Sequence, residues 1–559
     1  MSLEKRKISS STDQDSARKK IRIMKEKQPP NTPKRPAAGE EDDDDEWESV
    51  RQPKKLDELT EKEKQDILNE ETEAPEVEAL DEATLERLIL LFEIRALKNQ
   101  IMRLKFPDQL EKFMESEVKL HKTLQELQIV AATNLTNLYH MLMVELGAVP
   151  SLLELLSHEN TDIAVGVVDL LQALAKEGIL HEFQESADTF IDALLEQQVC
   201  ALLVQNLERL DETVNKEDSG VYNTLDIFMN LLEFRPDLCA DAGKQGLMQW
   251  LLRRVKIKTI TCDDDDPNKV LACMLLSRLL QHTPENRLLL SDLNGIDVLL
   301  QQLTYLQSHD PQTAQEHEIN EEIMENLFNV LCSSLMATVN RDRFLRGEGL
   351  QLMNLMLREK KMSWDGSLKV LDHAMNGPDG KDNCSKFVDI LGLQTIFPLF
   401  MKTPTHDRKR MLTAEKHVIS IIASLLKNCK GQQRQTLLSY FTENDYEKVD
   451  RLMELHFKYL EKVEEVKKNG KDDEDEKESY SRRLDGGLFI LNLVDYVLLE
   501  ACTGCPPAVK QRVRDLLAQR SLKTICHIMR EYAGNLGDAG DTEWKEAEQQ
   551  RILQLIDKF

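Results

Sequence analysis

The stretch GAVPSLLELLSHENTDIAVGVVDLLQALA, residues 147–175, decides the fold. Its apolar residues recur at intervals of three and four on both sides of a polar turn at 157–161, which predicts two amphipathic helices. Gly147 is suited to end the preceding helix, Pro150 suits the first turn of the next, and the Thr161 hydroxyl is a candidate cap for the second. Two such helices cannot bury their apolar surface alone, so similar units are expected to stack on them. This is the pattern of an armadillo-type repeat.

Related stretches follow along the chain. Similar first helices begin near residues 147, 198, 246, 295, 349 and 392, at intervals of 51, 48, 49, 54 and 43 residues. A second helix follows each one, and a short leading helix precedes four of them, so a unit of three helices favours armadillo over HEAT repeats. The sequence therefore predicts an all-α armadillo-repeat superhelix, an α-solenoid, with atypical helical caps at both ends and a disordered N-terminal tail.

Composition divides the chain into four segments. The cap that precedes the repeats is expected to hold a long helix from Asp81, then two separate short helices near 111–115 and 121–132. Charge-rich runs without apolar periodicity are interpreted as disordered. The predicted segments are a tail at 1–78, an N-terminal cap at 79–146, repeats at 147–441, and a C-terminal helical region at 442–559 with a charged loop at 461–479.

Length and charge restrict the function. A chain of 559 residues is too long for one compact core, which favours a repeat array. The net charge of −27 favours basic partners and argues against direct binding of nucleic acid. No run approaches the roughly 20 apolar residues of a membrane span, so no membrane partner is expected.

No catalytic motif is recognisable, so the protein is not expected to be an enzyme or to hold a cofactor. The sequence has no HExxH, phosphate-binding loop, dinucleotide fingerprint or nucleophile elbow. Its 10 cysteines are scattered among apolar residues, as in a protein of a reducing compartment. Cys502 and Cys505 have a ligand-like spacing but no second pair nearby, which favours thiols at a helix end over a metal or redox site.

The N-terminal tail is basic although the whole chain is acidic. Two clusters separated by ten residues match the spacing of a bipartite nuclear import signal, which a nuclear import carrier would bind. The alternative is a solvated basic tail, but the bipartite spacing is more demanding than a single cluster. An acidic run at 40–48 follows, either solvated or able to occupy a basic site. The predicted signal residues are Arg6, Lys7, Arg18, Lys19, Lys20 and Arg22.

Acidic residues recur on the predicted last helices of the repeats, which line the concave groove of an armadillo stack. Several acids at repeat spacing could bind the Lys and Arg side chains of an extended peptide. Each exposed pair contributes only about 0.2–1 kcal/mol, so affinity needs many contacts and should fall with salt. For any single acid, a solvated helix face is the alternative. The candidate groove residues are Asp162, Asp169, Asp226, Glu233, Glu325 and Asp372.

Longer segments resemble one known family. The segments are KFPDQLEKFMESE at 105–117, GEGLQLMNLMLREKK at 347–361 and ENDYEKVDRLMELHFKYL at 443–460. They are similar to the beta-catenin-like family of nuclear armadillo proteins, and the similarity runs from about residue 80 to the end of the sequence. The resemblance implies a nuclear scaffold of the spliceosome-associated complex built around the Prp-nineteen ubiquitin ligase, acting in pre-mRNA splicing. It also implies binding of basic nuclear-localisation-type segments of splicing factors, including a Myb-related cell-division-cycle-five-like protein, and in some members a cytidine deaminase.

The sequence departs from the classical import carriers, which place Trp and Asn at fixed positions on the groove helices. Trp47, Trp250, Trp364 and Trp544 are all expected outside those helices. A dedicated adaptor is therefore favoured over a general import receptor. A nuclear import adaptor for cargo with basic signals remains the alternative, and the sequence leaves open whether the C-terminal helices form a homodimer.

Overall fold

The computed structural model of the protein describes most of the chain after the N-terminal tail. The described residues are 54–69, 81–131, 136–256, 266–360, 364–403, 407–469, 476–517, 523–536 and 542–559. Contacts divide the chain into two compact units, of which one spans residues 53–513 and the other includes residues 514–559. The described residues form helices and no strand, which confirms the predicted all-α class. Within the second unit, α29 packs against α30.

The larger unit begins with helices that precede the repeats. They are η2 (Leu56–Glu58), α2 (Glu61–Asn69), α3 (Glu82–Lys105), α4 (Leu110–Ala131) and α5 (Thr136–Glu145). The first repeats comprise α6 (Ala148–Glu154), η4 (Leu155–Ser157), α7 (Thr161–Leu174), α8 (Glu177–Glu182), α9 (Gln184–Glu196), α10 (Val199–Leu207), α11 (Asn215–Phe234), η5 (Pro236–Leu238), α12 (Cys239–Ala242), η6 (Gly243–Leu247), α13 (Met248–Lys256) and α14 (Pro267–Gln281).

The array continues with the same succession of short and long helices. These are α15 (Pro284–Asp292), α16 (Gly295–Ser308), α17 (Ala314–Ser334), α18 (Thr338–Arg346), α19 (Gly349–Glu359), α20 (Trp364–Met375), η7 (Pro378–Gly380), α21 (Lys381–Asp389), α22 (Leu393–Met401), α23 (Arg408–Asn428) and α24 (Gly431–Ser439). The remaining helices are η8 (Tyr440–Thr442), η9 (Asn444–Tyr446), α25 (Glu447–Lys468), α26 (Glu476–Arg483), η10 (Leu484–Leu488), α27 (Phe489–Gly504), α28 (Pro507–Leu517), α29 (Lys523–Gly534) and α30 (Thr542–Lys558).

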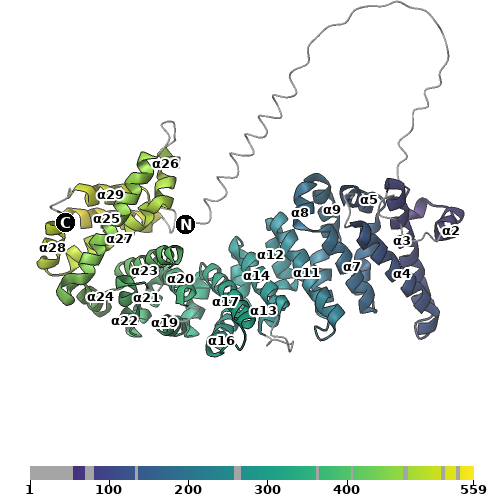
Figure 1. Cartoon of the computed structure of the whole chain (residues 1–559), viewed down its shortest axis with the longest axis horizontal. Helices are drawn as coiled ribbons and strands as arrows, with labels where there is room; N and C mark the ends of the chain where they lie inside the picture. The colour runs from purple at the N-terminus through teal and green to yellow at the C-terminus, as the bar shows by residue number, and fades with distance from the viewer. Residues whose placement is uncertain are drawn as a thin grey trace, which may run out of the picture. The chain divides into compact units, whose positions relative to one another are not determined.

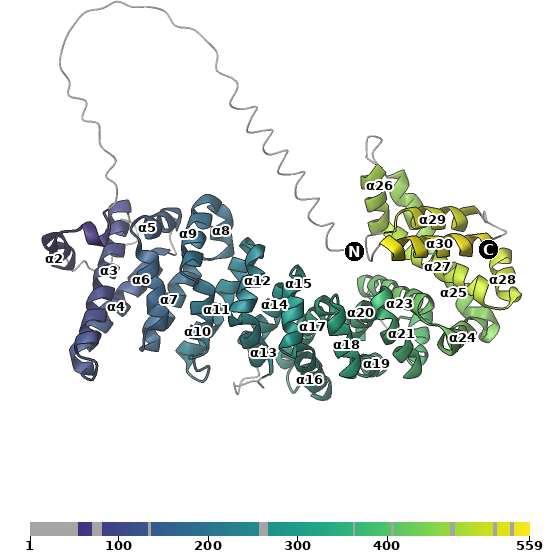
Figure 2. The ribbon, with the colours of Figure 1, turned by 180° about the vertical axis from the view of Figure 1, so that it is seen from behind.

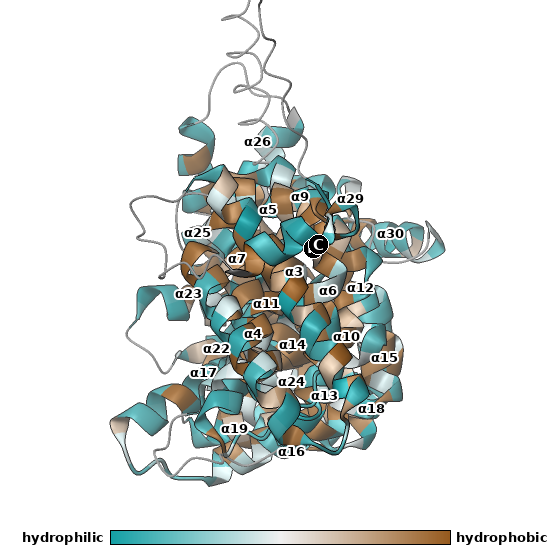
Figure 3. Cartoon of the chain, turned by 90° about the vertical axis from the view of Figure 1, so that its right-hand side faces the viewer, coloured by the Kyte–Doolittle hydropathy of each residue, from teal (hydrophilic) through white to brown (hydrophobic). Residues whose placement is uncertain are grey.

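One long helix from each repeat stacks on the corresponding helix of the next. The helices α4, α7, α11, α14, α17, α20, α23 and α27 pack on one another in that order (Figure 1). The first helices of the repeats, α10, α13, α16 and α19, lie along one edge of the array (Figure 2). Apolar residues gather inside the stack and polar residues on its margin (Figure 3). The helices α7 and α11 therefore bury their apolar sides in the stack and expose a narrow polar side.

The glycines that mark the repeats serve two purposes. Gly147 has a φ of 75°, which confirms the left-handed helix end predicted from the sequence. In later repeats the preceding residue takes this conformation, as Asn294 does with a φ of 55° and Glu348 with 62°. Gly349 is then required for packing, because a Cβ there would collide with the ring of Phe344. A glycine at the start of a repeat is thus needed for a left-handed backbone at Gly147, and for close packing against an aromatic ring at Gly349.

Buried asparagines join consecutive repeats, a feature that the sequence pattern did not indicate. The Asn286 amide donates to the backbone carbonyls of Cys239 at 2.7 Å and Leu279 at 2.9 Å. The Asn340 amide likewise donates to two backbone carbonyls, at 2.8 and 3.1 Å, one repeat later. Both side chains are fully buried. Each amide therefore links the C-terminal end of a long helix, α14 or α17, to a helix of the preceding repeat, α12 or α15.

The N-terminal cap differs from its prediction in one respect. The two short helices expected near 111–115 and 121–132 are one continuous helix, α4. Polar residues between the two expected helices are buried with partners: Ser116 accepts a hydrogen bond of 2.9 Å from Asn99 on α3, and Glu117 pairs with Arg103. These two polar residues therefore lie within one helix and bind it to α3.

The charged loop predicted at 461–479 was wrong at both ends. Residues 461–468 continue α25, and residues 476–479 begin α26. Tyr459 and Val463 remain buried at helical spacing, so the surrounding charges simply cover the exposed side of a helix. Residues 470–475 of the predicted loop lie outside the described residues.

One helical segment is more apolar than the sequence analysis allowed. Residues Lys477–Gly504 are long and apolar enough to cross a membrane by length and composition alone. In the folded chain, 78% of the most apolar part is buried, and α27 packs between α23 and α25. Burial on all sides within the protein accounts for this composition.

Candidate functional site: the exposed face of the stacked helices

The predicted groove acids of α7 and α11 lie on the polar sides of those helices. Asp162 and Asp169 occupy one side of α7, opposite residues such as Leu171 and Leu174 that are almost completely buried. Asp226 and Glu233 are placed in the same way on α11. The amphipathic spacing of the sequence therefore located this face correctly, although it did not indicate what the acids contact.

Three hydrogen bonds or ion pairs join these acids to the neighbouring helix, and together we call them the polar ladder. Lys216 donates to Asp162 at 3.1 Å, Asn223 to Asp169 at 2.8 Å, and Gln172 to Asp226 at 2.8 Å. Each pair is separated by 54 residues in the sequence. A constant separation means that α7 and α11 run parallel in one register. The missed partners could have been found by searching for a complementary polar residue one repeat later.

The remaining predicted acids have different environments. Glu233 forms an ion pair with Arg278 on α14. Glu325 on α17 is exposed, and its carboxylate has no hydrogen-bond or ion-pair partner among the described residues. Asp372 on α20 is buried and accepts a 2.8 Å hydrogen bond from His417 Nδ1 on α23. Asp372 therefore does not belong to the exposed face, because its neighbour covers it.

Burial changes the pKa of one carboxyl group of the polar ladder, that of Asp169. Desolvation raises the pKa of Asp169, and its hydrogen bond from Asn223 opposes that rise. The side chain is therefore partly shielded from water, where a charge-assisted contact is stronger than on an open surface. Asp162 is more open, with its side chain half exposed.

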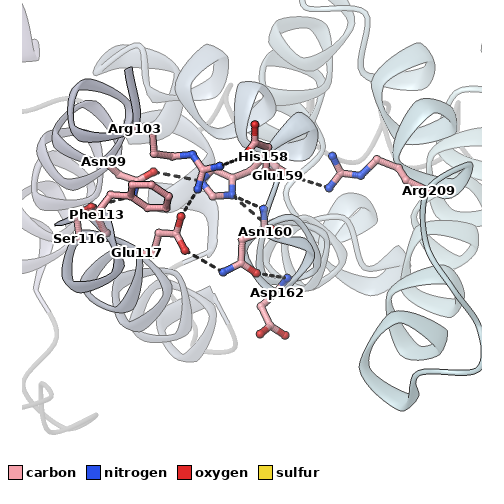
Figure 4. A network of polar contacts seen from close by, with 10 residues as sticks. All are labelled: Asn99, Arg103, Phe113, Ser116, Glu117, His158, Glu159, Asn160, Asp162 and Arg209. Atoms are coloured by element: carbon pink, nitrogen blue, oxygen red, sulfur yellow. Dashed lines mark hydrogen bonds and ion pairs between the residues drawn. The ribbon is translucent and has the colours of Figure 1, made fainter. Parts of the chain in front are cut away.

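A polar network fixes the turn that precedes α7 (Figure 4). The Arg103 guanidinium pairs with Glu117 and Glu159 and lies 4.7 Å from the centre of the Phe113 ring. The Asn160 amide donates to Glu117 at 3.1 Å, which ties the turn to α4. These contacts hold the start of α7, and with it Asp162, in a defined position.

The same network corrects the predicted helix cap. Asn160 rather than Thr161 caps α7, because its side chain accepts a 3.0 Å hydrogen bond from the backbone N–H of Asp162. The Thr161 hydroxyl donates instead to Glu217 on α11. His158 donates through Nε2 to Asn99 at 3.1 Å while Nδ1 accepts from the Asn160 N–H, and burial lowers the pKa of this imidazole.

The tryptophans also differ from the prediction in one case. Trp364 is the first residue of the stacked helix α20, whereas it was expected outside these helices. Its side chain is buried and offers no open ring face for a lysine stem. Trp250 lies on α13 and Trp544 on α30, outside the stack, and Trp47 lies outside the described residues.

Cations gather further along the stack, a feature that the sequence analysis did not single out. The buried carboxylate of Glu415 on α23 accepts from Arg451 at 3.2 Å, Lys458 at 2.6 Å and the Tyr459 hydroxyl at 2.8 Å. The surface where α25 meets α23 therefore carries basic as well as acidic side chains.

Two other predictions concern ligands and signals. Among the described residues, no group of three or more His, Cys, Asp or Glu side chains could hold a metal ion. Cys502 is buried, and the Cys505 thiol lies 3.4 Å from the backbone carbonyl of Leu438. The predicted import signal, Arg6 to Arg22, lies outside the described residues.

Known proteins resemble this chain along most of its length. Beta-catenin-like protein 1 of Mus musculus is 55% identical over 498 residues, covering 86% of each chain, and that of Homo sapiens is 54% identical with the same coverage. The Beta-catenin-like protein 1 homolog of Schizosaccharomyces pombe is 28% identical over 507 residues, covering 88% of this chain and 86% of the homolog.

The family model described as "Catenin-beta-like, Arm-motif containing nuclear" matches residues 62–530. This match confirms the resemblance expected from the quoted segments, the armadillo architecture and the nuclear localisation. The stacked helical repeats, their polar face and the similarity over most of the sequence agree, and the chain belongs to the catenin-beta-like family of nuclear armadillo-motif proteins.

Proposed function

We propose that this protein is a non-catalytic scaffold of the spliceosome-associated complex built around the Prp-nineteen ubiquitin ligase. In this role it binds basic nuclear-localisation-type segments of splicing factors, including a Myb-related cell-division-cycle-five-like protein, during pre-mRNA splicing. A cytidine deaminase with a basic segment is a further candidate partner. Membership of a nuclear armadillo family supports a role in the nucleus.

The observation that carries the proposal is the group of acids on the polar sides of the stacked helices. Asp162 lies on the polar side of α7, and Asp226 and Glu233 lie two helical turns apart on the polar side of α11. Glu325 on α17 is exposed and has no partner among the described residues. Lys216, the partner of Asp162, has a long side chain that is 67% exposed, so a peptide cation can replace it at little cost. Each contact contributes about 0.2–1 kcal/mol, and affinity arises from their number.

Charge-neutralising variants of the full chain test this proposal. The variant Asp162→Asn, Glu233→Gln, Glu325→Gln removes three acids from the stacked helices. The matched control changes three exposed acids on the short helices: Glu185→Gln on α9, Asp292→Asn on α15 and Asp342→Asn on α18. Both variants change the net charge equally, so only local contacts distinguish them.

The readout is affinity purification from nuclear extract, with identification of the co-purifying proteins at rising salt. Splicing factors with basic segments should be recovered with the unchanged chain and the control. Recovery with the first variant should fall about threefold or more, because three contacts of about 0.2–1 kcal/mol each are lost. Equal recovery with both variants would refute a basic-segment site on this face. Detection of substrate turnover by the purified chain would refute the non-catalytic role.

A nuclear import adaptor is the second candidate, favoured by the basic tail. Deleting residues 1–39 separates the two functions. If the shortened chain remains cytoplasmic while its partners still enter the nucleus, the tail serves only the import of this protein. If the partners also lose nuclear entry, the adaptor function is supported.

A further inference from the structure

Large apolar side chains are exposed beside the polar ladder. On α4, Val118 is 63% exposed and Ile129 is 55% exposed, and on α11 Tyr222 is 41% exposed. The neighbouring stacked helix α7, which lies between α4 and α11, presents Asp162 and Asp169. An acidic strip is thus bordered on both sides by uncovered apolar surface.

The positions of Val118 and Ile129 follow from the contacts of α4. Leu120 and Leu127 are completely buried, and at 100° per residue Val118 and Ile129 point to the opposite side of the helix. The side of α4 that faces α3 is marked by Ser116, which bonds to Asn99. Val118 and Ile129 are therefore directed away from the core and toward solvent.

The register between α4 and α7 places these residues beside the acids. His121 on α4 lies next to Gly166 on α7, and Glu117 bonds to Asn160 just before α7 begins. Val118 is accordingly level with the start of α7, where Asp162 lies. Ile129 is level with the C-terminal half of α7, which follows Asp169.

Tyr222 borders the strip on its other side. It precedes Asn223, whose amide bonds to Asp169, and it lies one helical turn before Asp226. Its ring can pack against an apolar side chain or against the stem of a lysine or arginine. The three exposed residues and the acids between them form one surface, which we call the mixed face.

The binding contributions of ion pairs and of buried apolar side chains favour a partner that contacts both the acids and the apolar residues of the mixed face. The ladder acids already have partners, so a peptide cation exchanges one contact for another and gains little. By contrast, burying an exposed Val or Ile side chain strengthens binding by about tenfold or more. A purely polar basic peptide would leave this larger contribution unused.

We propose that the segment bound at the mixed face carries bulky apolar side chains interspersed with its lysines and arginines. The apolar side chains cover Val118, Ile129 and Tyr222, and the cations contact Asp162, Asp169 and Asp226. This inference rests on the proposed function and adds a specificity to it, because a hydrophilic polybasic segment is then a poor ligand.

Three labelled peptides of equal length test this specificity by fluorescence anisotropy with the full chain. They alternate lysine with leucine, lysine with serine, and glutamate with leucine. The lysine–leucine peptide should bind at least about tenfold more tightly than the lysine–serine peptide, and the glutamate–leucine peptide should bind more weakly than both.

The variant Val118→Ser, Ile129→Ser should abolish most of the advantage of leucine. The matched control is Leu288→Ser, Val339→Ser, which changes two similarly exposed residues on α15 and α18 and should leave the advantage unchanged. All four positions are on the surface, so both variants should fold, as circular dichroism can verify.

The outcomes separate this inference from the proposed function. If both lysine peptides bind equally and salt weakens both, basic-segment binding survives and the apolar specificity is refuted. A leucine advantage that persists in the Val118→Ser, Ile129→Ser variant also refutes it. If neither lysine peptide binds, the proposed function fails and the inference fails with it.

Discussion

The most demanding stability prediction concerns Arg254, a buried cation in α13. Its guanidinium contacts Glu212 at 2.7 Å and Asp266 at 2.6 Å, and its side chain is only 3% exposed. Burial alone would lower the pKa of Arg254, but the hydrogen bonds from its guanidinium to Glu212 and the charge of Asp266 raise it above its usual value. The two carboxylates are also nearly buried, with exposed side-chain fractions of 11% and 6%.

Replacing Arg254 by methionine keeps most of the side-chain volume but leaves two buried carboxylates without their cation. Breaking a buried ion pair in this way costs about 3–5 kcal/mol of unfolding free energy. The triple variant Arg254→Met, Glu212→Gln, Asp266→Asn removes the stranded charges and should recover at least half of the loss. Asn at position 266 can still cap α14, where Asp266 now accepts from the Lys269 N–H at 3.0 Å.

Hydrogen exchange measured by mass spectrometry is the suitable assay, because a repeat array can open one section at a time. Exchange should accelerate in α13 and α14 of the Arg254→Met variant. The neighbouring Arg253→Met is the control, since Arg253 and Glu208 are both 54% exposed and their pair contributes at most about 1 kcal/mol. Equal effects of the two single variants, or a triple variant as unstable as Arg254→Met, would refute the reasoning.

Three further predictions follow from single positions. Gly366→Ala should lower the unfolding free energy by about 1–3 kcal/mol in urea titrations, because its Cβ would collide with the Phe328 ring; unchanged stability would contradict this packing. Asn340→Ala should cost about 1–3 kcal/mol in the same assay, since the carbonyls of Arg287 and Ser334 each lose a buried hydrogen bond, whereas a loss near zero would mean that water replaces the amide. Burial lowers the pKa of His373 to about 4, so the unfolded chain binds the proton first and stability falls as pH drops from about 6.5 toward 4. A His373→Gln variant should lose that part of the pH dependence in thermal unfolding; an unchanged pH profile would exclude His373 as its source.

Local sequence was sufficient to predict the class of the fold and the polar sides of helices such as α7 and α11. Apolar spacing along 147–175 is a local property, so it predicted the helices, the left-handed Gly147 and the polar position of Asp169. Charge-rich runs were less informative, because the same residues cover a helix or a loop. That is why 461–468 was interpreted as a loop although Val463 anchors it as a helix.

Only the tertiary structure decided which side chains meet. Asn223 contacts Asp169 across 54 residues because α7 and α11 stack in parallel and in register, and that register depends on packing between repeats. The burial of Asp372 beneath α23 and the exposure of Val118 on α4 have the same origin. Helical periodicity assigns a residue to a side of its own helix, but the neighbouring helix determines whether that side is covered, paired or open to a partner.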